Sequence, residues 1–196
     1  MLTTQQEWIE HTFTKQNLKQ AILTHKYFEE CTFNGCDFSE AELKHCKFID
    51  CEFVDCNLSL TKLNYSQFNS VKFLNCKIIG VNWTQATWAS IGIAYPLHFE
   101  KCILNDASFF GLQLQTSVFI ECKIHNADFG EANCERADFS YSDLQATSFH
   151  HTNLGYANFE GALNYNIDVL NCNIKGAKFS LPEAVQLLNS LGIEII

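Results

Sequence analysis

Large apolar side chains recur every five residues along most of this chain. From Phe13 onward every fifth position is nearly always Phe, Leu, Ile or Trp, and we call these the centre positions. They are Phe13, Leu18, Leu23, Phe28, Phe33, Phe38, Leu43, Phe48, Phe53, Leu58, Leu63, Phe68, Phe73, Ile78, Trp83 and Trp88, then, one residue out of phase, Phe99, Leu104, Phe109, Leu114, Phe119, Ile124, Phe129, Cys134, Phe139, Leu144, Phe149, Leu154, Phe159, Asn164, Val169, Ile174 and Phe179. Of the 17 Phe residues only Phe110 lies outside this set, so the chain is an internal repeat.

The position two residues before each centre is mostly Ala or Cys, and the other three positions are mostly polar. Side chains two residues apart in an extended chain point the same way, so the small residue and the centre face one interior. The two polar residues that follow interrupt this alternation, as a corner does. A period of five gives no single face on an α-helix of 3.6 residues per turn. The pattern therefore predicts an all-β solenoid of short extended faces joined by tight turns.

A second, longer spacing indicates four pentapeptides per coil. Amides and thiols recur at every fourth pentapeptide: Gln113, Asn133, Asn153 and Asn173; Cys36, Cys56 and Cys76; Cys102 and Cys122. Stacked coils would place such side chains in columns at the strand spacing of about 4.8 Å, and about eight coils would make a rod of roughly 40 Å. The register breaks at residues 89–98. We expect a bulge or short loop that corrects the register there, the alternative being a projecting loop that contacts a partner.

The two ends carry signals of their own. We expect residues 1–12, with Trp8, to form an N-terminal cap, because His11, Gln16 and Lys26 fill inward small positions of an irregular first coil. Residues 13–179 form the predicted β-helix. Residues 180–196 are predicted to form a capping and dimerisation segment, in which residues 180–183 (SLPE) make a capping box at the start of a short α-helix and Gly192 ends it.

The C-terminal segment is more apolar than a small cap requires. An open solenoid end exposes a coil cross-section that must be covered, either by the helix alone or by a second copy of the chain. The residues expected at a dimer interface are Leu187, Leu188, Leu191, Ile193, Ile195 and Ile196.

The chain carries 22 acidic and 13 basic residues, a formal net charge of −9, which disfavours a basic nucleic-acid-binding protein. Ten acids and eight bases lie in residues 1–98, against twelve and five in residues 99–196. Either the acids form a solubilising surface or they form an anionic rod that contacts a partner. The candidate partner-binding acids are Glu100, Glu121, Asp128, Glu131, Asp138, Glu160 and Asp168.

The sequence offers little for catalysis. Nine of the ten Cys residues occupy the small inward position and Cys134 is a centre, so we interpret them as core filling rather than as metal ligands or disulfides. No nucleophile, phosphate-loop or zinc-protease motif is present. We predict no enzyme activity, no cofactor, no metal and no binding to nucleic acid or membrane. With no long apolar run and no signal-like N-terminus, a cytoplasmic location is expected.

The motif A/C-x-F/L-x-x, repeated from Phe13 to Phe179, resembles the pentapeptide-repeat family. The resemblance implies a right-handed quadrilateral parallel β-helix. The C-terminal SLPEAVQLLNSLGIEII is similar to the end of the Qnr and microcin-immunity branch of that family, in which this segment forms a head-to-head dimer. The long loops of Qnr proteins from Gram-negative bacteria have no counterpart here, so the chain is more similar to the loop-less, immunity-type members.

The resemblance implies a function as well as a fold. It points to a non-catalytic protein that mimics DNA and binds a type II topoisomerase, gyrase or topoisomerase IV, with resistance to quinolones or to a toxin as the outcome. The alternative is a structural scaffold or protein-interaction module with an unrelated partner.

Overall fold

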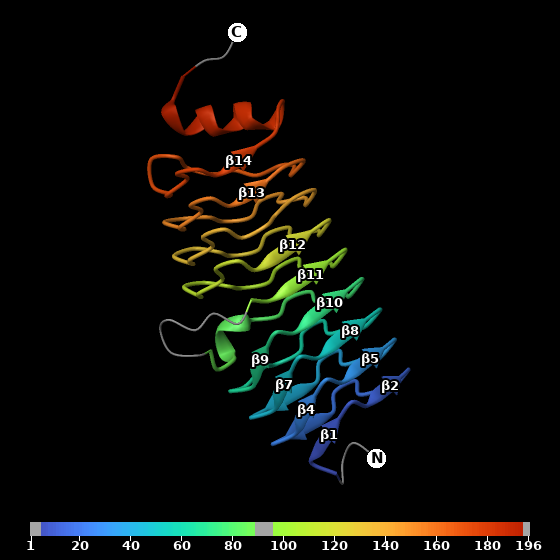
Figure 1. Cartoon of the computed structure of the whole chain (residues 1–196). Coiled ribbons are helices and arrows are strands. Elements are labelled where there is room, and N and C mark those ends of the chain that lie inside the picture. Colours follow the sequence, from blue (N-terminus) through green and yellow to red (C-terminus); the bar gives the residue numbers. More distant parts are fainter. Residues whose placement is uncertain (1–4, 89–95, 194–196) are drawn as a thin grey trace.

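The computed structural model describes residues 5–88 and 96–193 and shows a rod of stacked coils, with the first coil at one end and a short helix at the other (Figure 1). The strands are only two or three residues long, and all pair in parallel. In each of the longer strands the middle residue is the centre position and is buried between two more exposed neighbours. The predicted parallel β-solenoid is confirmed.

The elements occur in the order β1 (Glu7–Ile9), β2 (Thr12–Thr14), β3 (Ile22–Thr24), β4 (Tyr27–Glu29), β5 (Thr32–Asn34), β6 (Glu42–Lys44), β7 (Lys47–Ile49), β8 (Glu52–Val54), β9 (Gln67–Asn69), β10 (Lys72–Leu74), the 3-10 turn η1 (Trp83–Gln85), β11 (His98–Glu100), β12 (Val118–Ile120), β13 (Asn158–Phe159), β14 (Lys178–Phe179) and the helix η2 (Glu183–Leu191).

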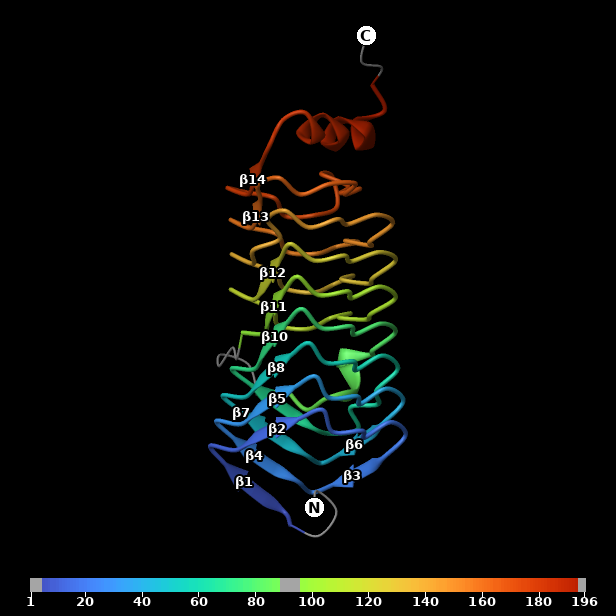
Figure 2. The ribbon, with the colours of Figure 1, turned by 90° about the vertical axis from the view of Figure 1, so that its right-hand side faces the viewer.

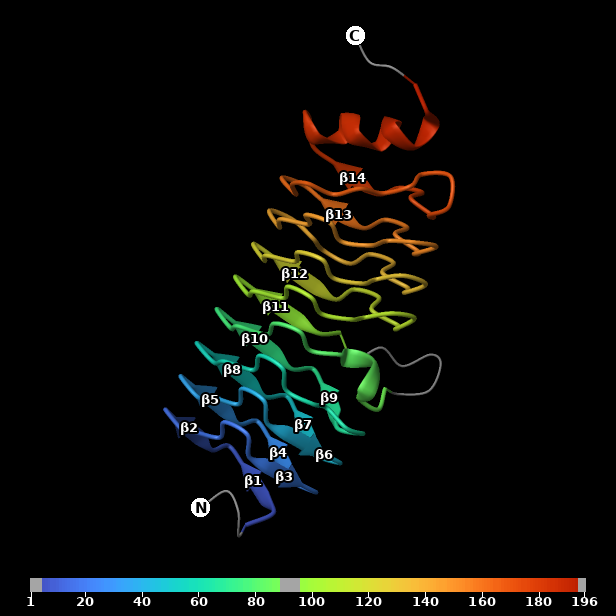
Figure 3. The same ribbon diagram turned by 180° about the vertical axis from the view of Figure 1, so that it is seen from behind.

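Four faces run along the rod (Figures 2 and 3). The β1 face holds β1, β4, β7 and β9 and continues as single bridges from Gln113 to Asn173. The β2 face holds β2, β5, β8, β10, β11 and β12, and bridges link β12 through Asp138 to β13 and β14. The β3 face begins with β3 and β6, and a fourth face is built from bridges alone, from Asn17 to Leu163.

The corners are formed by residues with left-handed backbone. The residue two after a centre has a φ of about +50° to +70° at corner after corner, and most of these residues are not glycine. Such a conformation costs an ordinary residue about 1–2 kcal/mol. The strain is offset by coil-to-coil hydrogen bonding, because the same residue donates its backbone N–H to the next coil, as Glu10 does to the carbonyl of Glu29 at 3.0 Å.

The core is a set of stacked aromatic rings. On the β2 face, Phe33 lies over Phe53 with ring centroids 4.6 Å apart and planes 13° apart. Rings from opposite faces meet edge to face across the interior, as Phe109 of the β3 face and Phe119 of the β2 face do at 5.6 Å and 84°. Every centre Phe from Phe13 to Phe159 is buried, so the inward assignment of this position is confirmed.

The cysteines form buried columns and are all free thiols. The backbone N–H of Cys36 donates to the Sγ of Cys56 at 3.3 Å, and the pattern continues from Cys56 to Cys76 and from Cys102 to Cys122. It also crosses the register break, because the N–H of Cys76 donates to the Sγ of Cys102 at 3.4 Å. Burial raises the pKa of the Cys51 thiol to about 12, which keeps it protonated and unreactive.

The register break is a longer coil rather than a single extra residue. Lys72 pairs with Glu52 on one side and with His98 on the other, so β10 and β11 still lie side by side. The step across the break is 26 positions, where the step between Cys36 and Cys56 is 20. The difference is one pentapeptide plus one residue, which explains the change of phase. Most of the predicted break, residues 89–95, lies outside the described residues.

A second irregularity was not predicted. Asn164 and Val169 continue the five-residue count, but Asn164 is an exposed corner with φ of +57° and Val169 is only partly buried. Tyr165 and Ile167 are buried instead, and the Tyr165 ring lies 5.5 Å from that of Phe179. The assignment of Asn164 and Val169 as inward centres is therefore wrong. The Asn164 amide instead donates to Asp143 at 2.8 Å at the surface, which avoids burying it unpaired, and the aromatic ring of Tyr165 fills the interior.

At the N-terminal end, the segment expected to cap the rod contains β1, whose Trp8 occupies a centre position and stacks on Phe28 at 5.0 Å. Lys26 stands in an inward position and is 7% exposed. Its ammonium group donates to the carbonyl of Gln5 at 2.6 Å and lies 5.6 Å from the Trp8 ring. Of the three polar residues expected in inward positions, Lys26 is therefore buried, whereas His11 and Gln16 are exposed.

At the other end, η2 is a 3-10 helix rather than the predicted α-helix. The predicted capping box does not form, because the Ser180 hydroxyl accepts from the N–H of Gly161 at 3.1 Å and the N-cap is Pro182. The prediction that Gly192 ends the helix is confirmed by its φ of +66°. Neither described helix is long and apolar enough to cross a membrane.

Replacing Phe129 with alanine is expected to lower the free energy of unfolding by about 3–5 kcal/mol, because the ring is fully buried between neighbouring coils. Phe110 provides the control, since it is 46% exposed and its loss should cost about 1 kcal/mol or less. Denaturant melts of Phe129→Ala and Phe110→Ala compare the two. Equal melting midpoints would contradict the inward assignment.

Candidate partner-binding surface

The seven acids proposed from the sequence fall on two faces. Glu100, Asp138 and Glu160 lie on the β2 face, and Glu121 stands at the corner that follows β12. The other three lie along the β3 face or its corner in the C-terminal half: Asp128, which bridges to Ser148, Glu131 at the corner that follows Phe129, and Asp168, which lines a surface hollow with Ser148 and His150. The structure therefore gathers the acids as two stripes rather than one patch.

The three aspartates are also structural. Each carboxylate accepts the backbone N–H two residues later: Asp128 from Gly130 at 2.8 Å, Asp138 from Ser140 at 2.9 Å and Asp168 from Leu170 at 2.9 Å. The pKa of Asp168 lies below its usual range, chiefly because the Asn171 side chain donates to the carboxylate and secondly because the backbone N–H of Leu170 does. These are Asx turns, which an aspartate one residue before a centre forms readily. This structural role was not predicted, although an Asp or Asn one residue before a centre is its signal in the sequence.

The four glutamates differ in the ion pairs and hydrogen bonds that their carboxylates make. Glu100 pairs with Lys101 at 3.2 Å and lies 3.7 Å from His98, and Glu121 lies 3.8 Å from the same lysine. Glu160 accepts a long hydrogen bond of 3.4 Å from the Tyr141 hydroxyl. Glu131 has no ion pair among the described residues. All four lie at the surface.

Two further polar features accompany these stripes. The predicted amide ladder is confirmed on the β1 face, where Asn173 donates to Asn153 at 2.7 Å and Asn153 to Asn133 at 2.9 Å. On the bridge-only face His125 and Asp143 lie 2.8 Å apart. Burial opposes ionisation of Asp143, but hydrogen bonds from Asn164 and His125 outweigh it and lower the pKa of the carboxyl. His125 and Asp143 belong to different coils, so only the stacking of coils brings them together.

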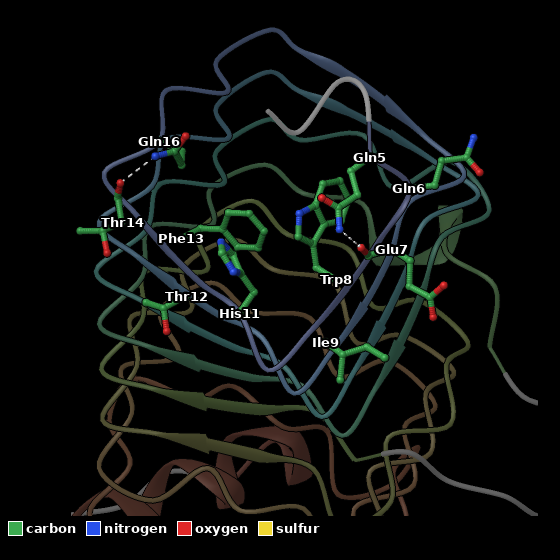
Figure 4. Close-up of a pocket in the computed structure, with 10 residues that line it drawn as sticks. All are labelled: Gln5, Gln6, Glu7, Trp8, Ile9, His11, Thr12, Phe13, Thr14 and Gln16. Carbon is green, nitrogen blue, oxygen red and sulfur yellow. Dashed lines mark hydrogen bonds between the residues drawn. The ribbon is translucent and has the colours of Figure 1, made fainter.

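A hollow of about 780 Å³ lies at the N-terminal end of the core (Figure 4). Trp8, His11 and Phe13 turn toward the axis of the rod, and Thr12 and Glu7 lie on its rim. The free edge is partly closed by side chains, because Gln5 donates to the carbonyl of Glu7 at 2.6 Å and Gln16 to that of Thr14 at 2.9 Å. Residues 5–88 and 96–193 hold no group of three or more potential metal ligands.

The C-terminal end is an apolar patch. Of the residues predicted to dimerise, Leu187 packs partly against the core, whereas Leu188, Leu191 and Ile193 are exposed. Ile195 and Ile196 lie outside the described residues. The same end exposes three further apolar side chains that the sequence analysis did not name: Leu170, Leu181 and Val185.

Comparison with known proteins places the chain among repeat proteins. A family model described as "Pentapeptide repeat region" matches residues 26–94 and 96–159. A trypsin-treated form of QnrB1, a plasmid-mediated fluoroquinolone resistance protein, superimposes with a TM-score of 0.65 at 21% identity, covering 97% of this chain and 92% of that one. HetL, involved in heterocyst differentiation regulation in the cyanobacterium Nostoc sp. strain PCC 7120, gives 0.66 at 17% identity, covering 88% and 84%. Full-length QnrB1 gives 0.56 at 18% identity, covering 95% and 100%. No curated protein matches the sequence.

Replacing Asp138 with alanine is expected to lower the free energy of unfolding by about 1–2 kcal/mol, since the carboxylate accepts from Ser140 and from the Asn158 amide at 3.1 Å. Asp138→Asn keeps an acceptor oxygen and should recover most of this loss. Glu160→Ala, on the same face, should change stability by less than about 0.5 kcal/mol. Denaturant melts of the three variants test the distinction, and an unaltered Asp138→Ala would show that the turn does not depend on its side chain.

Proposed function

The chain belongs to the pentapeptide-repeat family, and from this premise we propose that it is a non-catalytic binding protein that mimics DNA and binds a type II topoisomerase, gyrase or topoisomerase IV, with resistance to quinolones or a toxin as the outcome. The observation that carries the proposal is the arrangement of acids along a rod of regular coils. Acids outnumber bases twelve to five in residues 99–196, and the stripes on the β2 and β3 faces follow the rod axis.

The charge density fits a partial imitation of DNA, local to the acid-rich half of the rod. Double-stranded DNA carries one charge per roughly 1.7 Å, or about 24 over a length of roughly 40 Å. The chain as a whole carries −9, of which −7 belongs to residues 99–196. An aspartate that accepts a backbone N–H is still an anion, so the Asx turns hold charge at defined positions. A basic partner surface would be steered and oriented by these stripes.

The apolar patch at the C-terminal end supports a second part of the proposal, a two-fold dimer. Leu181, Val185, Leu188, Leu191 and Ile193 all belong to this end of the rod and are exposed to solvent. A second copy would cover them and would bring the acid-rich halves of two rods together. Two rods joined end to end would extend to roughly 80 Å.

A scaffold for an unrelated protein is the second candidate, and the β3 face favours it. Here His25, His45 and Tyr65 stack in a column with ring centroids 5.0 and 5.2 Å apart, and Phe110 is exposed further along. The column of His25, His45 and Tyr65 lies in the N-terminal half, where acids and bases nearly balance, and an exposed aromatic column of this kind suits a protein partner. HetL, which has a similar fold, is involved in heterocyst differentiation regulation.

A gyrase supercoiling assay, with and without a quinolone, tests the first candidate. The parent protein should change the supercoiling activity or its inhibition by the drug at micromolar concentration. Glu121→Lys/Glu160→Lys, which changes the net charge from −9 to −5, should need at least about tenfold more protein for the same effect. The double variant should melt like the parent, because both side chains are exposed.

The matched control for this assay is Glu10→Lys/Glu30→Lys, which makes the same change in charge at two exposed corners of the N-terminal half. It should behave like the parent. No effect of the parent on the enzyme would favour the scaffold. Equal loss in both double variants would show that net charge matters and the acid stripes do not.

Sedimentation of the full chain is expected to show a dimer of twice 22.3 kDa. Leu188→Lys should yield a folded monomer, because a stable interface of at least about 1,000 Å² cannot bury an unpaired ammonium group without loss. Leu60→Lys, at an exposed corner far from the patch, is the control and should remain dimeric. A monomeric parent would remove the dimer from the proposal.

A further inference from the structure

Two corners of the rod, one on each side of the β2 face, are built in the same way. At each corner an exposed tyrosine lies against a glycine of the next coil: Tyr141 against Gly161 and Tyr156 against Gly176. A Cβ added to either glycine would lie 2.6 Å from the tyrosine ring. One side of each ring is therefore covered by the neighbouring coil, and the glycine is what allows the ring to lie there.

The corner at Tyr156 already holds a cation. Arg136 stands at the same corner of the preceding coil, and its guanidinium carbon lies 5.4 Å from the ring centroid. The same guanidinium group pairs with Glu135 at 3.1 Å. This corner thus combines an aromatic face, a guanidinium group and a carboxylate, which is a favourable arrangement for both π-stacking and charge.

The corner at Tyr141 has the aromatic ring and the carboxylates without the cation. One coil before Tyr141, the residue at this corner is Glu121. At the Tyr156 corner the equivalent residue is Arg136. The Tyr141 hydroxyl donates to Glu160 at 3.4 Å, and the ring is 58% exposed. Among the described residues the cations found over aromatic rings are Lys26 and Arg136, and neither lies on Tyr141.

This arrangement favours a positive ligand. The face of an aromatic ring carries a negative quadrupole, so carboxylates beside it add to one negative potential. Lys101 satisfies part of Glu121 at 3.8 Å and is itself shared with Glu100 at 3.2 Å. Within the described part of the chain, the Glu160 carboxylate accepts one hydrogen bond, the long one from the Tyr141 hydroxyl through Oε1, and its Oε2 has no donor.

We propose that Tyr141, Glu121 and Glu160 form a receptor for an arginine side chain presented by a partner protein. The guanidinium group would stack on the Tyr141 ring and donate to the two carboxylates, reproducing the arrangement that Arg136 makes with Tyr156 and Glu135. We expect arginine rather than lysine, because the planar, weakly hydrated guanidinium group can stack on the ring and at the same time donate N–H groups to both carboxylates. Only the identity of the partner depends on the proposed function, because the chemistry of the site suits any protein with an exposed arginine.

The test uses the full chain labelled with 3-fluorotyrosine and followed by fluorine NMR at neutral pH. The Tyr141 signal is assigned with Tyr141→Phe. The probes are N-acetyl-arginine amide and its neutral analogue N-acetyl-citrulline amide. The Tyr141 signal is expected to shift and saturate with the arginine probe in the millimolar range, and to shift at least threefold less with the citrulline probe. Tyr65, which is 66% exposed, is the control ring and should not saturate.

Variants locate the site. Glu160→Gln and Glu121→Gln should each weaken binding of the arginine probe at least threefold, whereas Glu131→Gln, on the other stripe, should leave it unchanged. Arg136→Ala should free the Tyr156 ring and create a second signal that responds to the probe.

A Tyr141 signal that does not saturate, or that responds equally to citrulline, would overturn the proposal, as would equal responses of Tyr141 and Tyr65. No topoisomerase is present in this experiment. A negative result here therefore leaves the supercoiling test standing, and a failed supercoiling test leaves the arginine site standing.

Discussion

The hydrogen bonds between successive coils are the constraint on which the rest of this structure depends. Nearly every centre residue donates its backbone N–H to the coil that follows, as Leu18 does to the carbonyl of Asp37 at 2.7 Å. Corner residues do the same from a left-handed conformation that would be unfavourable in isolation. Once this pairing holds, each residue lies directly beside its equivalent in the next coil, and every property of the surface is arranged in columns.

Inward columns stabilise the fold, whereas outward columns carry the groups that a partner can contact. Inward columns are filled by Phe, Leu, Cys or Ala, because the interior is close-packed and the Phe rings of successive coils stack with centroids 4.6 to 5.5 Å apart. Outward columns have no such requirement, so they can carry carboxylates, amide ladders, stacked histidines or a tyrosine resting on a glycine. Among the described residues, the surfaces open to a partner are therefore the outward columns and the two ends, since side chains fill the axis of the rod.

The sequence predicted the repeating part well and the irregular parts poorly. The inward position was readable because one steric requirement is repeated in every pentapeptide, and the Asn and Cys columns followed from the repeat of four pentapeptides per coil. The count was wrong at Asn164, where Tyr165 is buried instead and the chain leaves the regular geometry for one coil. The capping box at Ser180 was wrong as well, because that hydroxyl accepts from the N–H of Gly161 in the preceding coil rather than from its own helix.

The sequence by itself determined the solenoid, its four faces, its buried thiols and the excess of acids in its second half, because each of these depends only on which residue type recurs at which interval. The tertiary structure decided which acids support turns and which remain free, that the lengthened coil keeps its neighbours in register, and that Tyr141 and Tyr156 differ in having an arginine beside them. These facts depend on distances between side chains of different coils. A one-dimensional pattern can place two residues in the same column, but only the packed coils decide which atoms meet.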